Sequence, residues 1–167
     1  MRNIRNILSV TAVTAVTLTA VAVSAPADTT RAPGKDIVET AAQAGKFKTL
    51  TSLLKRAGLV KTLKGKGPYT VFAPTDRAFA KVPDATLEAL GKDRAKLRSV
   101  LLYHVAEGRL TAAKVTKRRA VKTLNGQRLA IRVRGGKAFV GGARVVTPDV
   151  SASNGVIHVI NKVLLPR

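Results

Sequence analysis

Residues 70–79 read TVFAPTDRAF, a hydrophobic strand that runs into a polar turn and then into a short helix. Pro74 ends the strand because proline lacks the N–H group that a sheet ladder needs. Thr75 is a typical N-cap for the helix that follows. Two other segments also join a hydrophobic element to a polar turn: LLYHV at 101–105 and NGVIHVINKVLLP at 154–166. These three segments carry most of the information on the fold.

The first 27 residues have the pattern of a secretory signal peptide. Arg2 and Arg5 form a positive start, residues 7–23 are apolar, and Ala25-Pro26-Ala27 is a small-residue cleavage site. The alternative is an uncleaved membrane anchor, but the apolar run is short and rich in Thr for a span of about 20 residues. We therefore expect a signal peptide over 1–27, a linker over 28–33 and one domain over 34–167, in a secreted, extracellular protein. No later segment is apolar enough to span a membrane.

The hydrophobic period changes along the expected domain. Apolar residues recur at helical spacing over 36–45, 47–57, 75–79, 83–90 and 97–104. After Gly108 the period becomes two, which predicts strands over 120–124, 128–134, 138–140, 144–147, 156–160 and 163–165. Asn125-Gly126 is typical of a two-residue hairpin turn with positive φ at both positions, and Gly135-Gly136 can form a second such turn. Gly141-Gly142 indicates a third reversal or a bulge. Helices followed by a mostly antiparallel sheet indicate an α+β fold.

The chain is strongly basic, with 30 Lys and Arg against 9 Asp and Glu, a net charge of +21. In the expected strand 128–134, alternation turns Leu129, Ile131 and Val133 inward and places three arginines on the outer face, namely Arg128, Arg132 and Arg134. The preceding segment adds Lys117, Arg118 and Arg119. Arginine forks bind carboxylate, sulfate and phosphate groups bidentately. We interpret this surface as a docking site for an acidic polymer of a cell surface or matrix, and a merely solvated basic face is an equal alternative.

Nucleic acid is a weaker candidate ligand. Specific binding of single strands needs exposed aromatic rings on which bases stack. We expect that Phe47 and Phe139 do not cluster with the arginines, and the other aromatic residues lie in apolar patterns. Any binding of nucleic acid should therefore be non-specific and sensitive to salt.

Thr75, Asp76 and His104 are the residues that could form a hydrolase. Thr75 would be the nucleophile, but the chain lacks the glycine elbow that presents such a nucleophile, so helix capping is the favoured role for Thr75 and Asp76. His104 and His158 are the only histidines. Neither has a second metal ligand at helical or hairpin spacing, and each is expected to be a core residue that hydrogen-bonds to backbone. We expect no enzymatic activity, no cofactor and no metal.

The segments 70–79, 101–105 and 154–166 follow one another at ordinary spacing. Together they resemble the signature of the fasciclin domain family. Residues 70–79 resemble its first conserved box, residues 154–166 its second, and Tyr103-His104 its Tyr-His motif. Residues 123–127 are similar to the family's hairpin. The resemblance implies a compact wedge with β-sandwich-like sheets and a layer of short helices, and a secreted adhesion module without a reactive centre.

Some animal members of this family bind integrins through the Tyr-His motif and through an acidic Pro-Asp stretch before the second box. The corresponding residues here are Pro148, Asp149 and Val150, and Thr147 and Ser151 depart from the family's pattern. The expected loop 147–151 is therefore an alternative contact for a protein partner. Tyr103 and His104 lie in an apolar helical pattern and are expected to be structural.

Overall fold

The structure is a computed structural model that describes residues 34–166. The expected signal peptide and the linker 28–33 lie outside the described residues. Seven helices occur in the described part of the chain: α1 (Ile37–Gln43), α2 (Lys48–Arg56), α3 (Val60–Leu63), α4 (Asp76–Phe79), α5 (Asp84–Lys92), α6 (Arg94–Tyr103) and α7 (Ala112–Thr116). Within residues 34–166, no helix is long and apolar enough to cross a membrane.

The same range contains seven strands: β1 (Tyr69–Pro74), β2 (Val105–Glu107), β3 (Ala120–Lys122), β4 (Arg128–Arg134), β5 (Lys137–Val140), β6 (Ala143–Ala152) and β7 (Gly155–Ile160). Their order in the sheet is β2-β1-β7-β6-β5-β4-β3. All neighbouring pairs are antiparallel except β1 and β7, which are parallel. A bridge between Ala106 and Thr123 joins the two ends of this order, so the sheet forms a near-barrel.

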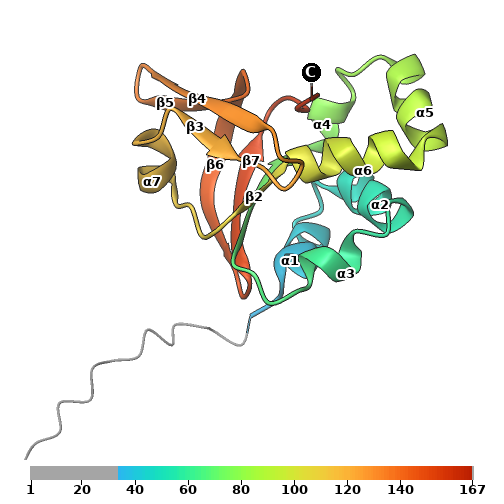
Figure 1. Ribbon diagram of the computed structural model, residues 1–167, viewed down its shortest axis with the longest axis horizontal. Coiled ribbons are helices and arrows are strands. Elements are labelled where there is room, and N and C mark those ends of the chain that lie inside the picture. Colours follow the sequence, from blue (N-terminus) through green and yellow to red (C-terminus); the bar gives the residue numbers. More distant parts are fainter. Residues whose placement is uncertain (1–33, 167) are drawn as a thin grey trace, which may run out of the picture. The chain divides into compact units, whose positions relative to one another are not determined.

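The predicted α+β fold with a mostly antiparallel sheet is confirmed. Figure 1 shows helices α1–α6 gathered on one side of the sheet, whereas α7 lies near the β3–β5 end. One apolar cluster lies between these helices and the strands β1 and β7, and a second cluster fills the inside of the near-barrel. Val71 and Ile157 belong to the first cluster, and Phe72 and Ile160 to the second. Both central strands are therefore buried on both faces, which explains their continuous apolar sequence.

Three short elements were not predicted from the sequence, namely α3, β2 and α7. In contrast, the strand predicted over 163–165 does not form. The segment predicted as a loop over 147–151 lies inside β6, whose pairing with β7 shifts register between Val145 and Thr147 and again between Thr147 and Val150. These irregularities are β-bulges, and the bulged residue Asp149 has φ 56°.

The predicted reversals occur at Asn125-Gly126, Gly135-Gly136 and Gly141-Gly142. Gly135 and Gly136 both have positive φ between the paired residues Arg134 and Lys137, as a two-residue hairpin of this kind requires. The prediction of a two-residue turn at Asn125-Gly126 is wrong. Only Gly126 has positive φ there, and the amide of Thr123 bonds to the carbonyl of Gln127, so this hairpin has a three-residue loop.

The prediction that Val133 lies in the core is wrong. Val133 shares one face of β4 with the buried Ile131, yet it is 49% exposed. It lies next to the hairpin at the end of β4, where its cross-strand neighbour is the small side chain of Ala138.

Candidate functional site

The outer face of the β3–β6 half of the sheet carries six cations. The strand registers place Lys122 opposite Arg128, Lys137 opposite Arg134, and Phe139 opposite both Arg132 and Arg144. Residues that are opposite each other in neighbouring strands share one face of the sheet. We call this set the basic face: Lys122, Arg128, Arg132, Arg134, Lys137 and Arg144. All six side chains are exposed.

The basic face has no internal counter-charge. The ion pairs within residues 34–166 involve Lys64, Lys92 and Lys96, and none involves a residue of the basic face. Six exposed cations without a carboxylate partner produce a positive potential that attracts anions and weakens as salt is added.

Lys117, Arg118 and Arg119 follow α7 and are exposed. The amide of Ile131 donates to the carbonyl of Arg119 over 2.8 Å, so this run lies beside β4. The expected proximity of the two basic segments is thereby confirmed.

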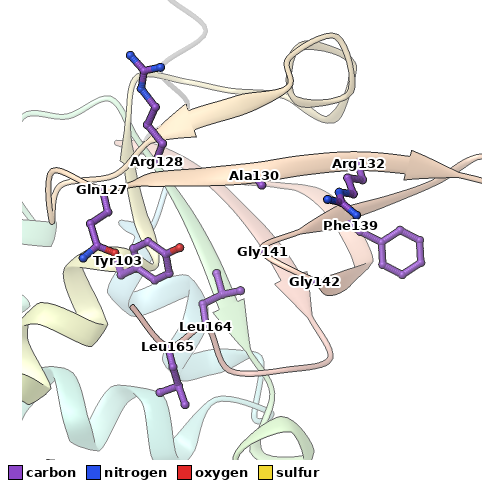
Figure 2. A pocket seen from close by; sticks show the side chains of 10 residues that line it. All are labelled: Tyr103, Gln127, Arg128, Ala130, Arg132, Phe139, Gly141, Gly142, Leu164 and Leu165. Carbon is purple, nitrogen blue, oxygen red and sulfur yellow. The ribbon is translucent and has the colours of Figure 1, made fainter. Parts of the chain in front are cut away.

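The expectation that Phe139 is remote from the arginines is wrong. Phe139 lies directly opposite Arg132 in the β4–β5 pair, in the register that the two-residue turn at Gly135-Gly136 sets. Phe139, Arg132, Ala130 and Arg128 line one side of a hollow of about 550 Å³, and Tyr103 from the end of α6 lines it too. Figure 2 shows the Arg132 guanidinium beside Phe139, whereas Arg128 extends away from Tyr103.

Thr75 and Asp76 are capping residues. The Thr75 hydroxyl accepts from the amide of Ala78 at the start of α4, over 3.3 Å. The Asp76 carboxylate accepts from the amides of Lys48 and Thr49, over 3.3 and 2.9 Å, at the start of α2. Since the N-cap of α2, Phe47, has no side-chain acceptor, Asp76 caps that helix from a distant part of the chain.

His104 is a structural residue of the core, as expected, and is only 2% exposed. Nδ1 lies 2.8 Å from the carbonyl of Val100, and Nε2 accepts from the amide of Leu164 over 2.9 Å. These partners fix the neutral ring with its proton on Nδ1. Burial lowers the pKa of His104 to about 4, although the bond to Val100 acts in the opposite direction. Because both ring nitrogens are engaged with backbone, His104 has no free nitrogen to accept a proton from Thr75.

His158 is also buried, and it stacks on Phe72 with ring centroids 5.6 Å apart. Nε2 lies 2.7 Å from the carbonyl of Leu110, and Nδ1 accepts from the amide of Asp149 over 3.3 Å. In the part of the chain that the structure describes, no group of three or more His, Asp or Glu side chains is placed to hold a metal ion.

The Pro148–Val150 segment is partly occupied by the protein's own contacts. The Asp149 carboxylate accepts from the amide of Ala112 over 2.8 Å and so caps α7, whose N-cap Thr111 makes no side-chain bond. Asp149 thereby links β6 to α7 and, through its amide, to His158 in β7. Pro148 is exposed and Val150 is half-buried.

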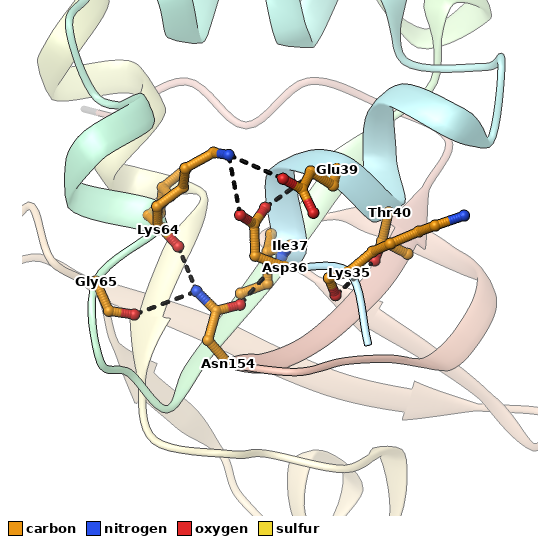
Figure 3. Close-up of polar contacts among 9 residues, drawn as sticks. Lys35, Asp36, Ile37, Glu39, Thr40, Lys64, Gly65 and Asn154 are labelled. Carbon is orange, nitrogen blue, oxygen red and sulfur yellow. Dashed lines mark hydrogen bonds and ion pairs between the residues drawn. The ribbon is translucent and has the colours of Figure 1, made fainter. Parts of the chain in front are cut away.

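Asn154 is a structural residue whose role the sequence did not reveal. Its side-chain oxygen accepts from the amide of Ile37, and its side-chain nitrogen donates to the carbonyls of Leu63 and Gly65 (Figure 3). Next to it, Lys64 pairs with Glu39 and Asp36 over 3.0 and 3.2 Å. The hydrogen bonds to Glu39 and Asp36 raise the pKa of Lys64. A polar residue at a strand turn is a weak signal, and only the fold shows that Asn154 joins β7, α1 and α3.

The sequence profile of the fasciclin domain matches residues 45–166. The chain belongs to the fasciclin domain family. Protein sll1483 of Synechocystis is 48% identical over 132 residues, which are 78% of this chain and 73% of that protein. Immunogenic protein MPB70 of Mycobacterium bovis is 39% identical over 123 residues, which are 71% of this chain and 62% of that protein.

Solved structures give the same fold. A domain pair from the insect cell adhesion molecule Fasciclin I superposes with a TM-score of 0.59 at 22% sequence identity. That match covers 73% of this chain and 46% of the insect chain, and it shows the fold alone. Thr75, Asp76, His104 and Asn154 all lie within the part of the chain that matches the fasciclin profile, whereas Ile37, which donates to Asn154, lies outside it.

Proposed function

We propose that this protein is a secreted fasciclin-type adhesion module that attaches to an acidic polymer of a cell surface or extracellular matrix. Arg128, Arg132 and Arg134 carry the contact, and Lys117, Arg118 and Arg119 assist from the neighbouring segment. The module acts by binding and has no reactive centre.

One observation carries this proposal: the three arginines lie on one exposed face of β4, in a set of six cations that has no acidic partner within residues 34–166. A face of this kind binds repeated carboxylate, sulfate or phosphate groups by many weak contacts that add together. Two further observations agree with it. The chain belongs to the fasciclin domain family, and a structure of the same fold comes from a protein described as a cell adhesion molecule.

The test is retention on cells of the producing culture, followed by elution with a salt gradient. The unaltered protein should stay on the cells at low salt and elute as salt rises, because screening weakens contacts between exposed charges. The triple variant R128S/R132S/R134S should elute at clearly lower salt.

A matched control removes three cations from the helical side of the domain. Lys46, Lys55 and Lys61 are exposed, and replacing them with serine lowers the net charge by the same amount. This control should elute close to the unaltered protein if the position of the charge matters. Equal elution of the two triple variants would show that total charge alone holds the protein to the cells.

A protein partner that binds near residues 147–151 is the second candidate. Val146 is 51% exposed and Pro148 is exposed, so β6 presents apolar surface beside Asp149. Such binding should survive moderate salt. Pro148→Ser is a better probe than a change at Asp149, because the Asp149 carboxylate caps α7.

A further inference from the structure

The hollow beside the basic face has a volume and a lining that attachment by charge alone would not need. It has a volume of about 550 Å³, within the range of about 300–1,000 Å³ that is typical of pockets for small molecules. Residues of β4 and β5 line one side, and Tyr103 and the C-terminal Leu164 and Leu165 line another (Figure 2).

On the β4 side of the hollow, two arginines flank a residue with a small side chain. Arg128 and Arg132 are four residues apart on one strand, which separates their backbones by about 13 Å at about 3.3 Å per residue. Ala130 lies between them on the same face, and its small side chain leaves the floor open. No acidic residue lines the hollow, so an anionic group meets no repulsion there.

The aromatic rings are placed differently from those of a single-strand nucleic-acid groove. Such grooves present aromatic rings on which successive bases stack. Figure 2 shows Tyr103 and Phe139 at opposite ends of the hollow, with Ala130 and the Gly141-Gly142 turn between them. Phe139 lies opposite Arg132 of β4 and Arg144 of β6, so the ring stands between two arginine positions rather than in a row of rings.

We propose that this hollow is a subsite for one acidic sugar unit of a polysaccharide. The carboxylate or sulfate of the sugar pairs with the Arg132 guanidinium, and the apolar C–H face of the sugar ring packs on Phe139. Ala130 leaves room for the ring, and the Tyr103 hydroxyl is available to a sugar hydroxyl at the other end. This inference rests on the proposed function and names the polymer class that the basic face selects.

The experiment measures binding of the purified protein to an oligogalacturonate and to an inorganic polyphosphate of equal charge, by calorimetry at fixed salt. Phe139→Ala should weaken oligogalacturonate binding about fivefold, since an aromatic contact contributes roughly 1 kcal/mol. The same change should leave polyphosphate binding unaltered. Arg132→Ser should weaken the binding of both ligands.

Two further variants complete the experiment. Ala130→Leu fills the hollow from an exposed position and should reduce the preference for oligogalacturonate without any change of charge. Val133→Ala removes a smaller exposed apolar group from the opposite face of the same strand and should change the affinity for neither ligand.

The outcomes separate the subsite from the proposed function. Oligogalacturonate binding that is unchanged in both Phe139→Ala and Ala130→Leu would overturn the subsite while leaving electrostatic attachment intact. A single-stranded DNA oligomer that loses as much affinity as oligogalacturonate in Phe139→Ala would overturn it in favour of nucleic acid. If no polyanion binds even at low salt, the proposed function itself fails.

Discussion

The backbone amide of Leu164 donates a hydrogen bond to Nε2 of His104 over 2.9 Å, within a pair that is buried and 60 residues apart in the chain. This bond fastens the segment after β7 to the end of α6. It also requires the neutral imidazole, because a protonated Nε2 cannot accept a hydrogen bond. His104 of the Tyr-His motif thus connects two buried segments that are far apart in the chain.

We predict that the free energy of unfolding falls as the pH is lowered from about 6.5 to about 4. The folded protein holds the pKa of His104 at about 4, below its usual 6.5. Between these values the unfolded chain binds more protons than the folded one, so acid favours unfolding. The stability that the neutral His104 contributes is complete above pH 6.5 and is lost by about pH 4. The difference between the two pKa values corresponds to roughly 3 kcal/mol in the free energy of unfolding. Urea denaturation at a series of pH values measures this change.

His104→Gln is the control for this pH dependence, since its amide does not titrate. The variant should be less stable at pH 7, and its stability should change less between pH 6.5 and 4 than that of the unaltered protein. An identical pH dependence in both proteins would assign the effect to carboxylates and contradict the prediction.

Asp76 should contribute to stability as a cap of α2. Asp76→Ala leaves the amides of Lys48 and Thr49 without their acceptor and should lower the free energy of unfolding by about 1–2 kcal/mol. Asp84→Ala is a suitable control, because Asp84 is exposed in the first turn of α5 and its neighbour Pro83 is the N-cap. It should change stability by less than about 0.5 kcal/mol. Equal losses in the two variants would rule out a special role for Asp76.

Local patterns in the sequence were sufficient for the capping role of Thr75 and for the burial of the two histidines. Thr75 follows a strand and precedes an apolar helix turn, and both histidines alternate or recur with apolar neighbours, so capping and burial could be predicted from spacing alone. The glycine pairs likewise predicted the reversals, because positive φ at two successive residues is a local requirement.

Features that depend on distant partners could not be predicted. Asp76 caps a helix that begins 28 residues earlier, which no local pattern indicates. The pairing of Phe139 with Arg132, in contrast, follows from a two-residue turn at Gly135-Gly136. Asp149 looked like part of an exposed loop, yet bulges keep its segment inside β6 while its carboxylate caps α7. Short elements such as β2 have too few residues to show a period at all.

Asn154 should be among the polar residues on which stability depends most. It is 6% exposed, and Asn154→Ala would leave the amide of Ile37 and the carbonyls of Leu63 and Gly65 without partners in a buried place. We expect a loss of about 2–4 kcal/mol, with faster hydrogen exchange at the Ile37 amide.

Asn161→Ala is the matched control for Asn154, because the Asn161 side chain accepts a single bond from the amide of Arg144 at a half-buried site. It should cost about 1 kcal/mol or less. A loss in Asn154→Ala no larger than this would show that water replaces the missing bonds.

Two glycines should respond to alanine in opposite directions. At Gly155, a Cβ atom would lie 2.0 Å from the carbonyl oxygen of Tyr69, so β1 and β7 would have to move apart. Because both strands are buried on both faces, Gly155→Ala should cost more than about 3 kcal/mol. Gly91 lies inside α5, where the nearest atom to a Cβ would be a guanidinium nitrogen of Arg56 at 3.6 Å. Gly91→Ala should therefore stabilise the protein by about 0.5–1 kcal/mol, through its higher helix propensity. Thermal unfolding of the two variants beside the unaltered protein measures both changes in stability. A Gly155→Ala variant as stable as the unaltered protein would contradict the close approach of β1 and β7.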